Sequence, residues 1–337
     1  MLTWPHADTD WKPFLTEITH TYLQLADAIT RYEQLLVATP DVESTRQVLL
    51  TVLSSDQMEK IRLYEVESND TWARDHGPIA MVMPKESDLN STPIHLLNFK
   101  FNGWGEKFRW EKDNAINQQL FDKAAFNADL ENHLDFVLEG GSIESDGKGT
   151  LFTTSQCLLA PHRNQPLTRE DIESQLRSFF NLRQVVWLDH GNLVGDDTDG
   201  HIDTIVRMAP HDTLLYVGCD DPTDEQYDDF QALELQLKSL SNIEGKPYRL
   251  LKLPMPNAIY DEEGYRLPAT YANFLILNKA LIYPTYNQPK KDEEAKRQIQ
   301  LAFPDREIIG VDSRTIIRQH GSIHCLTMQL PEGAIRE

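Results

Sequence analysis

The sequence contains few cysteines and no long hydrophobic run. Its 337 residues include three cysteines, Cys157, Cys219 and Cys325. Their odd number and wide separation fit neither a disulfide framework nor a C-x-x-C redox or metal site, so we expect reduced thiols. The most apolar region, Tyr271 to Tyr286, is interrupted by asparagines and a lysine before the roughly 20 residues that a bilayer requires. The sequence therefore predicts no transmembrane helix.

Basic residues are scarce relative to acidic ones. The chain has 32 lysines and arginines against 53 aspartates and glutamates, a formal net charge of -21. Such a surface repels nucleic acid and anionic membranes and attracts cations, so a small cationic substrate would suit it. The first residues carry neither the basic start nor the apolar core of a signal peptide, which predicts a cytoplasmic location.

Stretches rich in glycine, serine or proline, which would indicate linkers, are also missing. We therefore expect one domain that covers residues 1–337. Asp10 and Pro13 predict the start of an amphipathic helix. Short β-branched or alternating runs predict strands; these runs are Val48 to Leu53, Ile61 to Val66, Ile79 to Val82, His95 to Phe101, Val185 to Leu188 and Leu214 to Val217.

Helical stretches alternate with these strands; they are Glu111 to Ala125, Thr168 to Phe180, Thr223 to Leu240 and Asp292 to Ala302. A hairpin is predicted between Asn273 to Leu277 and Leu281 to Pro284, around an Asn-Lys turn. About five strand and helix units fit the length, and the hairpins favour mixed rather than purely parallel sheets. The fold class is therefore α/β with mixed sheets.

Polar residues of unusual type stand beside glycine or at the ends of the predicted strands; they are Asp75, Glu139, His201, Asp203 and Cys325. Glycine permits close backbone approach, which a chain needs when it presents side chains to a ligand. Taken singly, each residue also has an ordinary structural interpretation. A cysteine among apolar residues is usually a core residue, as we expect for Cys157 and Cys219. An aspartate beside an arginine can be an ion pair.

The spacing within DGHID suggests a pair. If this segment is extended, His201 and Asp203 point to the same face. By the same alternation His324 and Cys325 point to opposite faces, which makes His324 a poor base for the neighbouring thiol. His201 is the better candidate.

Several segments, taken together and in the same order across almost the whole chain, resemble the agmatine deiminase family. They are WPHADTDW, NDTWARDHGPI, FNGWGEKF, LEGGSIESDGKGTLFTT, DDTDGHID, PATYANFLI, FPDREIIGV and GSIHC. The resemblance implies a five-bladed pseudo-symmetric α/β propeller, the pentein fold, with helices outside the sheets. It also implies that no metal or organic cofactor is required.

The same match implies a role for each polar residue. Cys325 corresponds to the nucleophile, His201 to the general acid and base, and Glu139 to the carboxylate partner of that histidine. Asp75 and Asp203 correspond to ligands of the guanidinium group.

Pocket residues follow from the same match. Trp72 and Asp197 match positions that line the pocket around the aliphatic chain and amine, and Trp104 is a further substrate-binding candidate. The sequence departs from the family pattern at three positions, His76, His320 and Ser322, where threonine, glycine and asparagine are expected.

These roles suit the hydrolysis of agmatine to N-carbamoylputrescine and ammonia. A guanidinium carbon is a weak electrophile, so carboxylates must hold the cation and a thiolate must attack it. Free or peptidyl arginine is an alternative substrate, because the guanidinium end of the pocket would be the same.

Two further alternatives remain. A zinc hydrolase could use His201, Asp203, Glu139 and Cys325 as ligands, although the chain lacks H-E-x-x-H or paired-cysteine spacing. A non-catalytic propeller that acts as a binding module would make these residues structural. A homodimer is the general expectation for a soluble enzyme.

Overall fold

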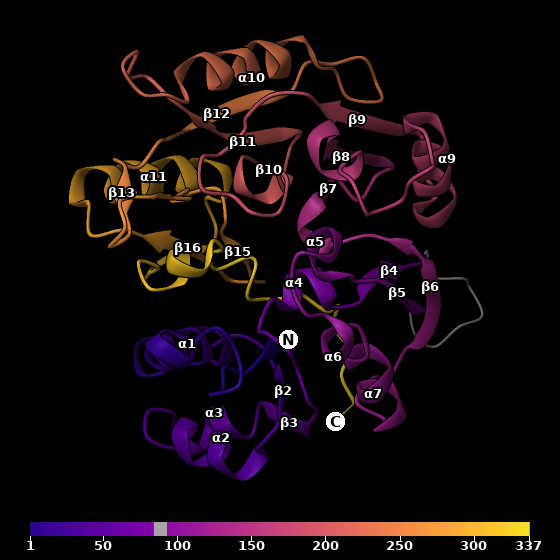
Figure 1. Cartoon of the computed structure of the whole chain (residues 1–337), viewed down its shortest axis with the longest axis vertical. Helices are drawn as coiled ribbons and strands as arrows, with labels where there is room; N and C mark the ends of the chain where they lie inside the picture. Colours follow the sequence, from indigo (N-terminus) through magenta and orange to yellow (C-terminus); the bar gives the residue numbers. More distant parts are fainter. Residues whose placement is uncertain (84–92, 337) are drawn as a thin grey trace. The chain divides into compact units, whose positions relative to one another are not determined.

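The structure, a computed structural model, describes residues 1–83 and 93–336. The chain divides into two compact units. Unit 1 comprises Met1–Gly140 and Cys325–Glu337, and unit 2 comprises Gly141–His324. Each unit has its own strands and helices (Figure 1). Among the described residues, no helix combines the length and the apolarity needed to cross a membrane.

The strands of unit 1 form two three-stranded sheets, β1-β2-β3 and β4-β5-β6. These strands are β1 (Leu2–Thr3), β2 (Leu35–Thr39), β3 (Ile61–Glu65), β4 (Ile79–Val82), β5 (Ile94–Lys100) and β6 (Asp129–Val137). The helices are η1 (Lys12–Phe14), α1 (Leu15–Thr30), α2 (Val42–Leu49), α3 (Ser55–Met58), α4 (Ala73–His76), α5 (Gly103–Glu106), α6 (Glu111–Asn114) and α7 (Ile116–Asp122). A short 3₁₀ helix, η2 (Gly140–Ser142), spans the point where the chain passes into unit 2.

Unit 2 contains three three-stranded sheets, β7-β8-β9, β10-β11-β12 and β15-β16-β17, and the two-stranded ribbon β13-β14. The strands are β7 (Ile143–Ser145), β8 (Thr150–Thr154), β9 (Gln184–Leu188), β10 (Val206–Ala209), β11 (Thr213–Gly218), β12 (Arg249–Pro254), β13 (Ile259–Tyr260), β14 (Arg266–Leu267), β15 (Leu275–Ile276), β16 (Ala280–Thr285) and β17 (Glu307–Asp312). The helices are α8 (Ser155–Leu158), α9 (Arg169–Phe180), η3 (Ile202–Thr204), α10 (Tyr227–Ser239), α11 (Pro289–Ala302) and η4 (Ile316–Gln319).

Four of the sheets repeat one pairing pattern. Their first two strands are antiparallel and the third is parallel to the second, as in β10-β11-β12 and β15-β16-β17. A crossover that contains helix joins the two parallel strands, for example α10 between β11 and β12. The mixed α/β fold is thus confirmed, with sheets that combine both pairing types as predicted.

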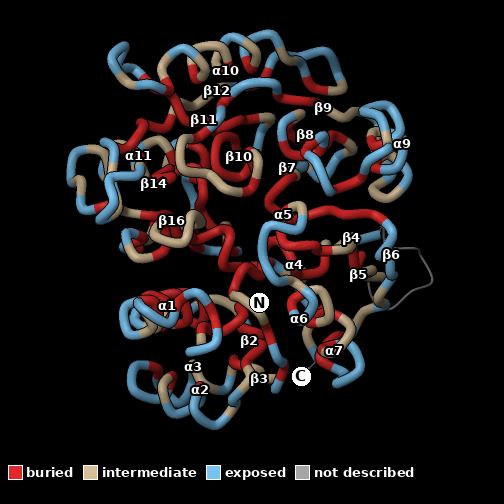
Figure 2. The backbone as a smooth tube through the Cα atoms, in the orientation of Figure 1, coloured by how far each residue is buried: buried red, intermediate tan, exposed pale blue. Residues whose placement is uncertain are grey.

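The middle strand of each three-stranded sheet carries the core. Strands β2, β8 and β11 are buried along their whole length, because neighbours cover both of their edges and both of their faces. In unit 2, α10 packs on β11 and α9 on β9, and Figure 2 shows the buried backbone concentrated in such strands. Each unit has its own cluster of buried apolar side chains, the larger one in unit 2.

Most predicted elements are confirmed, including the hairpin β15-β16 and the helix α9, which a capping box at Thr168 starts. One predicted strand is wrong. Val48 to Leu53 belongs to the end of α2 and the turn after it, because Asp41 caps a helix there by accepting from Ser44 N over 2.9 Å. The predicted helix from Glu111 to Ala125 is two short helices, α6 and α7.

Candidate active site

In unit 1, Asp75 lies in the four-residue helix α4 and is 4% exposed. The indole Nε1 of Trp104 donates a hydrogen bond to Asp75 Oδ2 over 3.0 Å. A buried carboxylate that accepts from a rigid indole keeps one orientation. Trp104 therefore orients Asp75, a contact that the sequence did not reveal.

The motif around Trp104 is a left-handed bend. Gly103, Trp104 and Gly105 have φ values of 66°, 55° and 86°, and Asn102 Oδ1 accepts from Gly105 N over 3.0 Å. The left-handed conformation costs a non-glycine residue about 1 kcal/mol. Phe101 packs edge-on against the Trp104 ring at 5.0 Å between centroids, which helps to hold the strained residue in place. The F-N-G-W-G sequence thus aims the indole at Asp75.

Cys325 lies in a turn and is 5% exposed. Its carbonyl oxygen accepts a hydrogen bond from the backbone N–H of Arg74 over 3.0 Å. Arg74 directly precedes Asp75 in α4. Unit 1 therefore brings the Cys325 segment and the Asp75 helix together through the main chain.

Glu139 is fully buried and follows the end of β6. Gly140, the next residue, allows a close approach that other residues could not make. A Cβ at Gly140 would lie 2.2 Å from the carbonyl oxygen of Arg74. The E-G-G sequence is thus required for the chain after Glu139 to pack against the Asp75 helix.

Trp72, the residue before α4, is 5% exposed. Its ring lies 5.7 Å from that of Trp11, at a tilt of 46°. Trp11 in turn donates from Nε1 to Thr71 Oγ1 over 2.8 Å. Two segments that were far apart in the sequence, WPHADTDW and NDTWARDHGPI, therefore pack together in unit 1.

In unit 2, His201 is 1% exposed and begins the 3₁₀ helix η3, which contains Asp203. The expectation that both side chains share one face of an extended segment is wrong. Thr204 Oγ1 donates to the His201 carbonyl over 2.7 Å, and Thr198 Oγ1 accepts from His201 N over 3.1 Å. Such local side-chain hydrogen bonds compete with strand formation and favour a tight turn.

The residue before His201 is held from both sides. Gly200 has φ of 90°, donates its N–H to Asp196 Oδ2 over 2.7 Å and accepts from Thr154 Oγ1 over 2.6 Å. Because Thr154 ends the buried strand β8, this contact ties the His201 segment to a sheet. The backbone of His201 is thus fixed from the rigid part of unit 2.

Asp203 is fully buried, and its Oδ2 lies 2.6 Å from His324 Nδ1. The other ring nitrogen of His324 lies 3.1 Å from Nη2 of Arg207. Both nitrogens of His324 are therefore occupied, which agrees with its rejection as the base. The contact between His324 and Arg207 was not predicted from the sequence. A charged residue inside the buried strand β10 could have indicated that Arg207 has a buried partner.

Asp199 is held by a buried arginine of the same unit. Asp199 accepts from the buried Arg163, with 2.7 Å between Arg163 Nη1 and Asp199 Oδ2. Arg163 Nη2 also donates to the Thr198 carbonyl over 2.6 Å. Asp199 is thus structural, whereas Asp197 is partly exposed, and its role as a substrate ligand stays a prediction.

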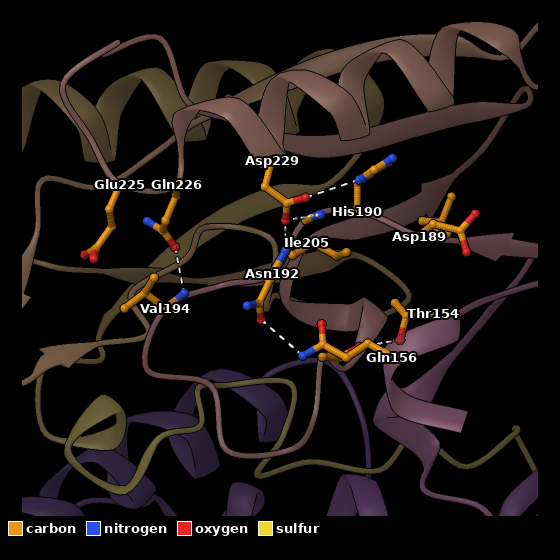
Figure 3. A pocket seen from close by; sticks show the side chains of 13 residues that line it. Thr154, Gln156, Asp189, His190, Asn192, Val194, Ile205, Glu225, Gln226 and Asp229 are labelled. Atoms are coloured by element: carbon orange, nitrogen blue, oxygen red, sulfur yellow. Dashed lines mark hydrogen bonds and ion pairs between the residues drawn. The ribbon is translucent and has the colours of Figure 1, made fainter. Parts of the chain in front are cut away.

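A cavity of about 300 Å³ in unit 2 lies beside the loop that leads to His201 (Figure 3). Its polar groups hold that loop. Asp229 accepts from the backbone N–H groups of Gly191 and Asn192 over 2.9 and 2.6 Å, and Gln226 Oε1 accepts from Val194 N over 2.7 Å. Helix α10 thereby anchors the loop, and we interpret this cavity as part of the scaffold.

The two remaining cysteines are buried, as predicted for core residues. Cys219 belongs to the apolar cluster of unit 2. Cys157 offers its Sγ within 4.8 Å of a ring nitrogen of His201.

The three departures from the family pattern have defined surroundings. His76 is buried, which lowers its pKa to about 3, and its Nε2 lies 3.2 Å from Thr3 Oγ1. His320 adopts the left-handed conformation with φ of 62°, which explains why glycine suits this position. Ser322 Oγ lies 3.5 Å from the hydroxyl of Tyr286.

Comparison with known proteins identifies relatives over nearly the whole chain. The family model of Porphyromonas-type peptidyl-arginine deiminase matches residues 1–331. A curated protein of Marinomonas sp. (strain MWYL1), provisionally named agmatine deiminase, is 34% identical, with 98% of this chain and 91% of that protein aligned.

Two solved structures are also similar. A Porphyromonas gingivalis protein provisionally described as an arginine deiminase has 46% identity and a TM-score of 0.91, covering 99% of this chain and 96% of that one. A cysteine-to-serine variant of C. jejuni agmatine deiminase with substrate bound has 38% identity and a TM-score of 0.87, covering 97% and 91%. The chain therefore belongs to the Porphyromonas-type peptidyl-arginine deiminase family.

Proposed function

We propose that this protein hydrolyses agmatine to N-carbamoylputrescine and ammonia through a covalent intermediate on Cys325. The observation that carries the proposal is the presence of every reactive residue type within a family match over residues 1–331. Two solved relatives named agmatine deiminase, one with its substrate bound, support the choice of substrate.

The proposed reaction starts from the thiolate of Cys325. Its sulfur adds to the guanidinium carbon while Asp75 and Asp203 hold the cation through charge-assisted hydrogen bonds. Asp75, oriented by the indole of Trp104, is suited to this task because its carboxylate does not need to reorganise. The C–S bond forms and the carbon becomes tetrahedral.

His201 then donates a proton to one amino group, the C–N bond breaks and ammonia leaves. The S-alkylthiouronium that remains is attacked by water, from which His201 removes a proton. Collapse of the second tetrahedral species expels the thiolate and releases the ureido product. In this scheme Glu139 holds His201, and no metal or organic cofactor takes part.

The far end of the substrate decides between agmatine and arginine. Agmatine ends in an ammonium group, which the partly exposed Asp197 would attract and the pocket-lining Trp72 would flank. Arginine carries a carboxylate there, which the acidic surface disfavours.

Arginine, free or within a peptide, remains the second candidate substrate. The family description and the similarity to the P. gingivalis protein favour it. Arginine turnover that exceeds agmatine turnover would establish this alternative.

We further propose that residues 1–337 act as one cytoplasmic domain and that the five three-stranded sheets are the blades of a pentein propeller. The pairing pattern shared by four of the sheets supports this assignment. A homodimer stays a prediction, which light scattering on the purified protein would test.

The test of the proposed function is release of ammonia and ureido product from agmatine, arginine and a blocked arginine peptide. Cys325→Ala should abolish turnover, and Cys219→Ala, which changes another buried thiol, should leave it nearly unchanged. Activity should survive a chelator. Loss on chelation with recovery on adding zinc would favour the metal hydrolase, and no turnover of any guanidine would favour the binding module.

A further inference from the structure

A chain of four polar side chains, three of them buried, crosses the interior of unit 2. It runs from Glu144 in β7 through Arg207 in β10 and His324 to Asp203 in η3. Arg207 Nε lies 3.0 Å from Glu144 Oε2, and its Nη2 lies 3.1 Å from His324 Nε2. His324 Nδ1 lies 2.6 Å from Asp203 Oδ2. The side chains of Arg207, His324 and Asp203 are 3%, 6% and 0% exposed.

Arg207 fixes the protonation of His324. A guanidinium group stays charged and only donates hydrogen bonds, so the facing Nε2 of His324 must accept. The imidazole is then neutral, with its proton on Nδ1, and donates that proton to Asp203. Asp203 Oδ2 is the acceptor of this hydrogen bond.

Arg207 is itself held rigidly. Its Nη1 donates to the carbonyl oxygens of Ala272 and Phe274 over 3.0 and 2.6 Å, and its guanidinium lies 4.5 Å from the centroid of the Phe274 ring. Glu144 is fixed as well, because its Oε1 accepts from Met208 N over 3.0 Å. The guanidinium of Arg207, whose Nη2 faces His324, is therefore held in one position.

The backbone of His324 is also fixed. Its N–H donates to both oxygens of Asn273, the carbonyl over 3.1 Å and Oδ1 over 2.9 Å. The next residue along the chain is Cys325. Hydrogen bonds thus hold both the ring and the main chain of His324, the residue directly before the thiol of Cys325.

We propose that His324 is a positioning residue, held by Arg207 as the neutral Nδ1–H tautomer, that fixes the carboxylate of Asp203 for the guanidinium group. The inference rests on the proposed function for the role of Asp203. It takes His324 out of proton transfer and explains why a histidine stands next to the thiol.

The first test measures the tautomer and needs no activity. The native protein is labelled with ¹⁵N-histidine, and its imidazole nitrogens are recorded between about pH 5 and 8, the range in which histidines normally titrate. Loss of a signal set in His324→Asn identifies the residue. We expect a protonated Nδ1 and an unprotonated Nε2 throughout. A proton on Nε2, or a charged imidazolium, would overturn the proposal.

The second test compares two variants whose side chains both branch at Cγ, in the folded protein. His324→Leu removes the donor to Asp203, whereas His324→Asn keeps an amide N–H near the position of Nδ1. We expect kcat/KM for the guanidine substrate to fall about 100-fold in His324→Leu, as for a misplaced binding group, and to be largely restored in His324→Asn. Equal losses in both variants, or full activity in His324→Leu, would refute the role.

The two tests separate this inference from the proposed function. If the native protein turns over neither agmatine nor arginine, the proposed function fails while the tautomer measurement still decides the state of His324. If turnover is normal and the tautomer is wrong, only the positioning role fails. Circular dichroism of both variants identifies any loss of folding, in which case the tautomer of the native protein decides.

Discussion

Two buried carboxyl groups in unit 1 behave unlike ordinary aspartates. Burial raises the pKa of Asp113 to about 8, although the backbone N–H groups of Asn69 and Asp70 donate to it over 2.6 and 3.1 Å. Burial likewise raises the pKa of Asp70 to about 7. Asp70 lies in the loop that leads to Trp72, and Asp113, in α6, contacts the main chain of that loop.

Asp113→Asn should therefore change how stability depends on pH. The folded state holds the Asp113 proton more tightly than the unfolded chain, whose aspartates titrate near pH 4, so the free energy of unfolding falls as pH rises from about 4 to about 8. The variant, which cannot ionise, should gain stability relative to the native protein at the upper end of that range.

Urea unfolding at a series of pH values measures this difference. Asp171→Asn is the control of opposite sign, because hydrogen bonds from Thr168 lower the pKa of the exposed Asp171. A constant difference between Asp113→Asn and the native protein across the range would contradict the expectation.

His320 provides a second prediction at this scale. It occupies the left-handed region with φ of 62°, and its Nδ1 lies 2.7 Å from the carbonyl of Gly195 in the loop that leads to His201. His320→Ala keeps the strain and loses the hydrogen bond, whereas His320→Gly loses both. His320→Gly should therefore be more stable than His320→Ala by about 1 kcal/mol in denaturant unfolding. The reverse order would show that the backbone is not strained there.

The residues of the candidate site were found from the sequence through motifs rather than through geometry. Glycine and strand-end position indicated Asp75, Glu139 and His201, and the structure places them in a short helix, after β6 and at the start of η3. The contacts that orient them, Trp104 to Asp75 and His324 to Asp203, were not predictable. They join residues 29 and 121 positions apart, and no local pattern marks such a pairing.

At the scale of elements, prediction succeeded for edge strands as well as for middle strands. Runs such as Ile61 to Val66 and Leu214 to Val217 correspond to β3 and β11. It failed at Val48 to Leu53, because a short apolar run suits the end of a helix as well as a strand. Asp41, the cap of α2, was the signal that would have decided between them.

The anchoring of the His201 loop by α10 makes a prediction about this element. Asp229→Ala should free the backbone N–H groups of Gly191 and Asn192 and loosen the loop up to Gly200. We expect hydrogen exchange to accelerate in residues 190–200 at least tenfold, on the basis of a loss of more than about 1.4 kcal/mol for the two bonds. Exchange in β1-β2-β3 should not change.

The neighbouring Asp228 provides the matched control. It lies on the same helix and is exposed. Asp228→Ala should leave exchange in the loop as it is in the native protein. Equal protection of the loop in Asp229→Ala and Asp228→Ala would show that α10 does not anchor it.

At the scale of the whole molecule, the net charge of -21 predicts how substrates are captured. A negative surface raises the encounter rate of cations, and salt screens the effect. If the proposed function holds, kcat/KM should fall as ionic strength rises, more steeply for the dication agmatine than for arginine, which carries a single net charge. Parallel salt dependences for the two substrates would exclude long-range attraction as the source of selectivity.

The number of strand and helix units was predictable from the length and the alternation of patterns, and five three-stranded sheets are found in the described residues. The sequence shows no clear residue-level repeat between these units, and this has a physical reason. Each middle strand needs only apolar side chains of suitable volume, so the repeated pairing does not require repeated residues. The division of the chain into two units was not predicted, since no change in composition marks Gly140 or Cys325.

The division has a consequence for the order of synthesis. Unit 1 is built from two stretches of chain, and the bridge between Leu2 and Thr327 joins them. The segment with Cys325 leaves the ribosome only after all of unit 2 has been made. The first stretch of unit 1 therefore lacks its contacts with the second stretch while the 184 residues from Gly141 to His324 are translated. A nascent chain accordingly lacks Cys325, the proposed nucleophile, until nearly all of the two units has been synthesised.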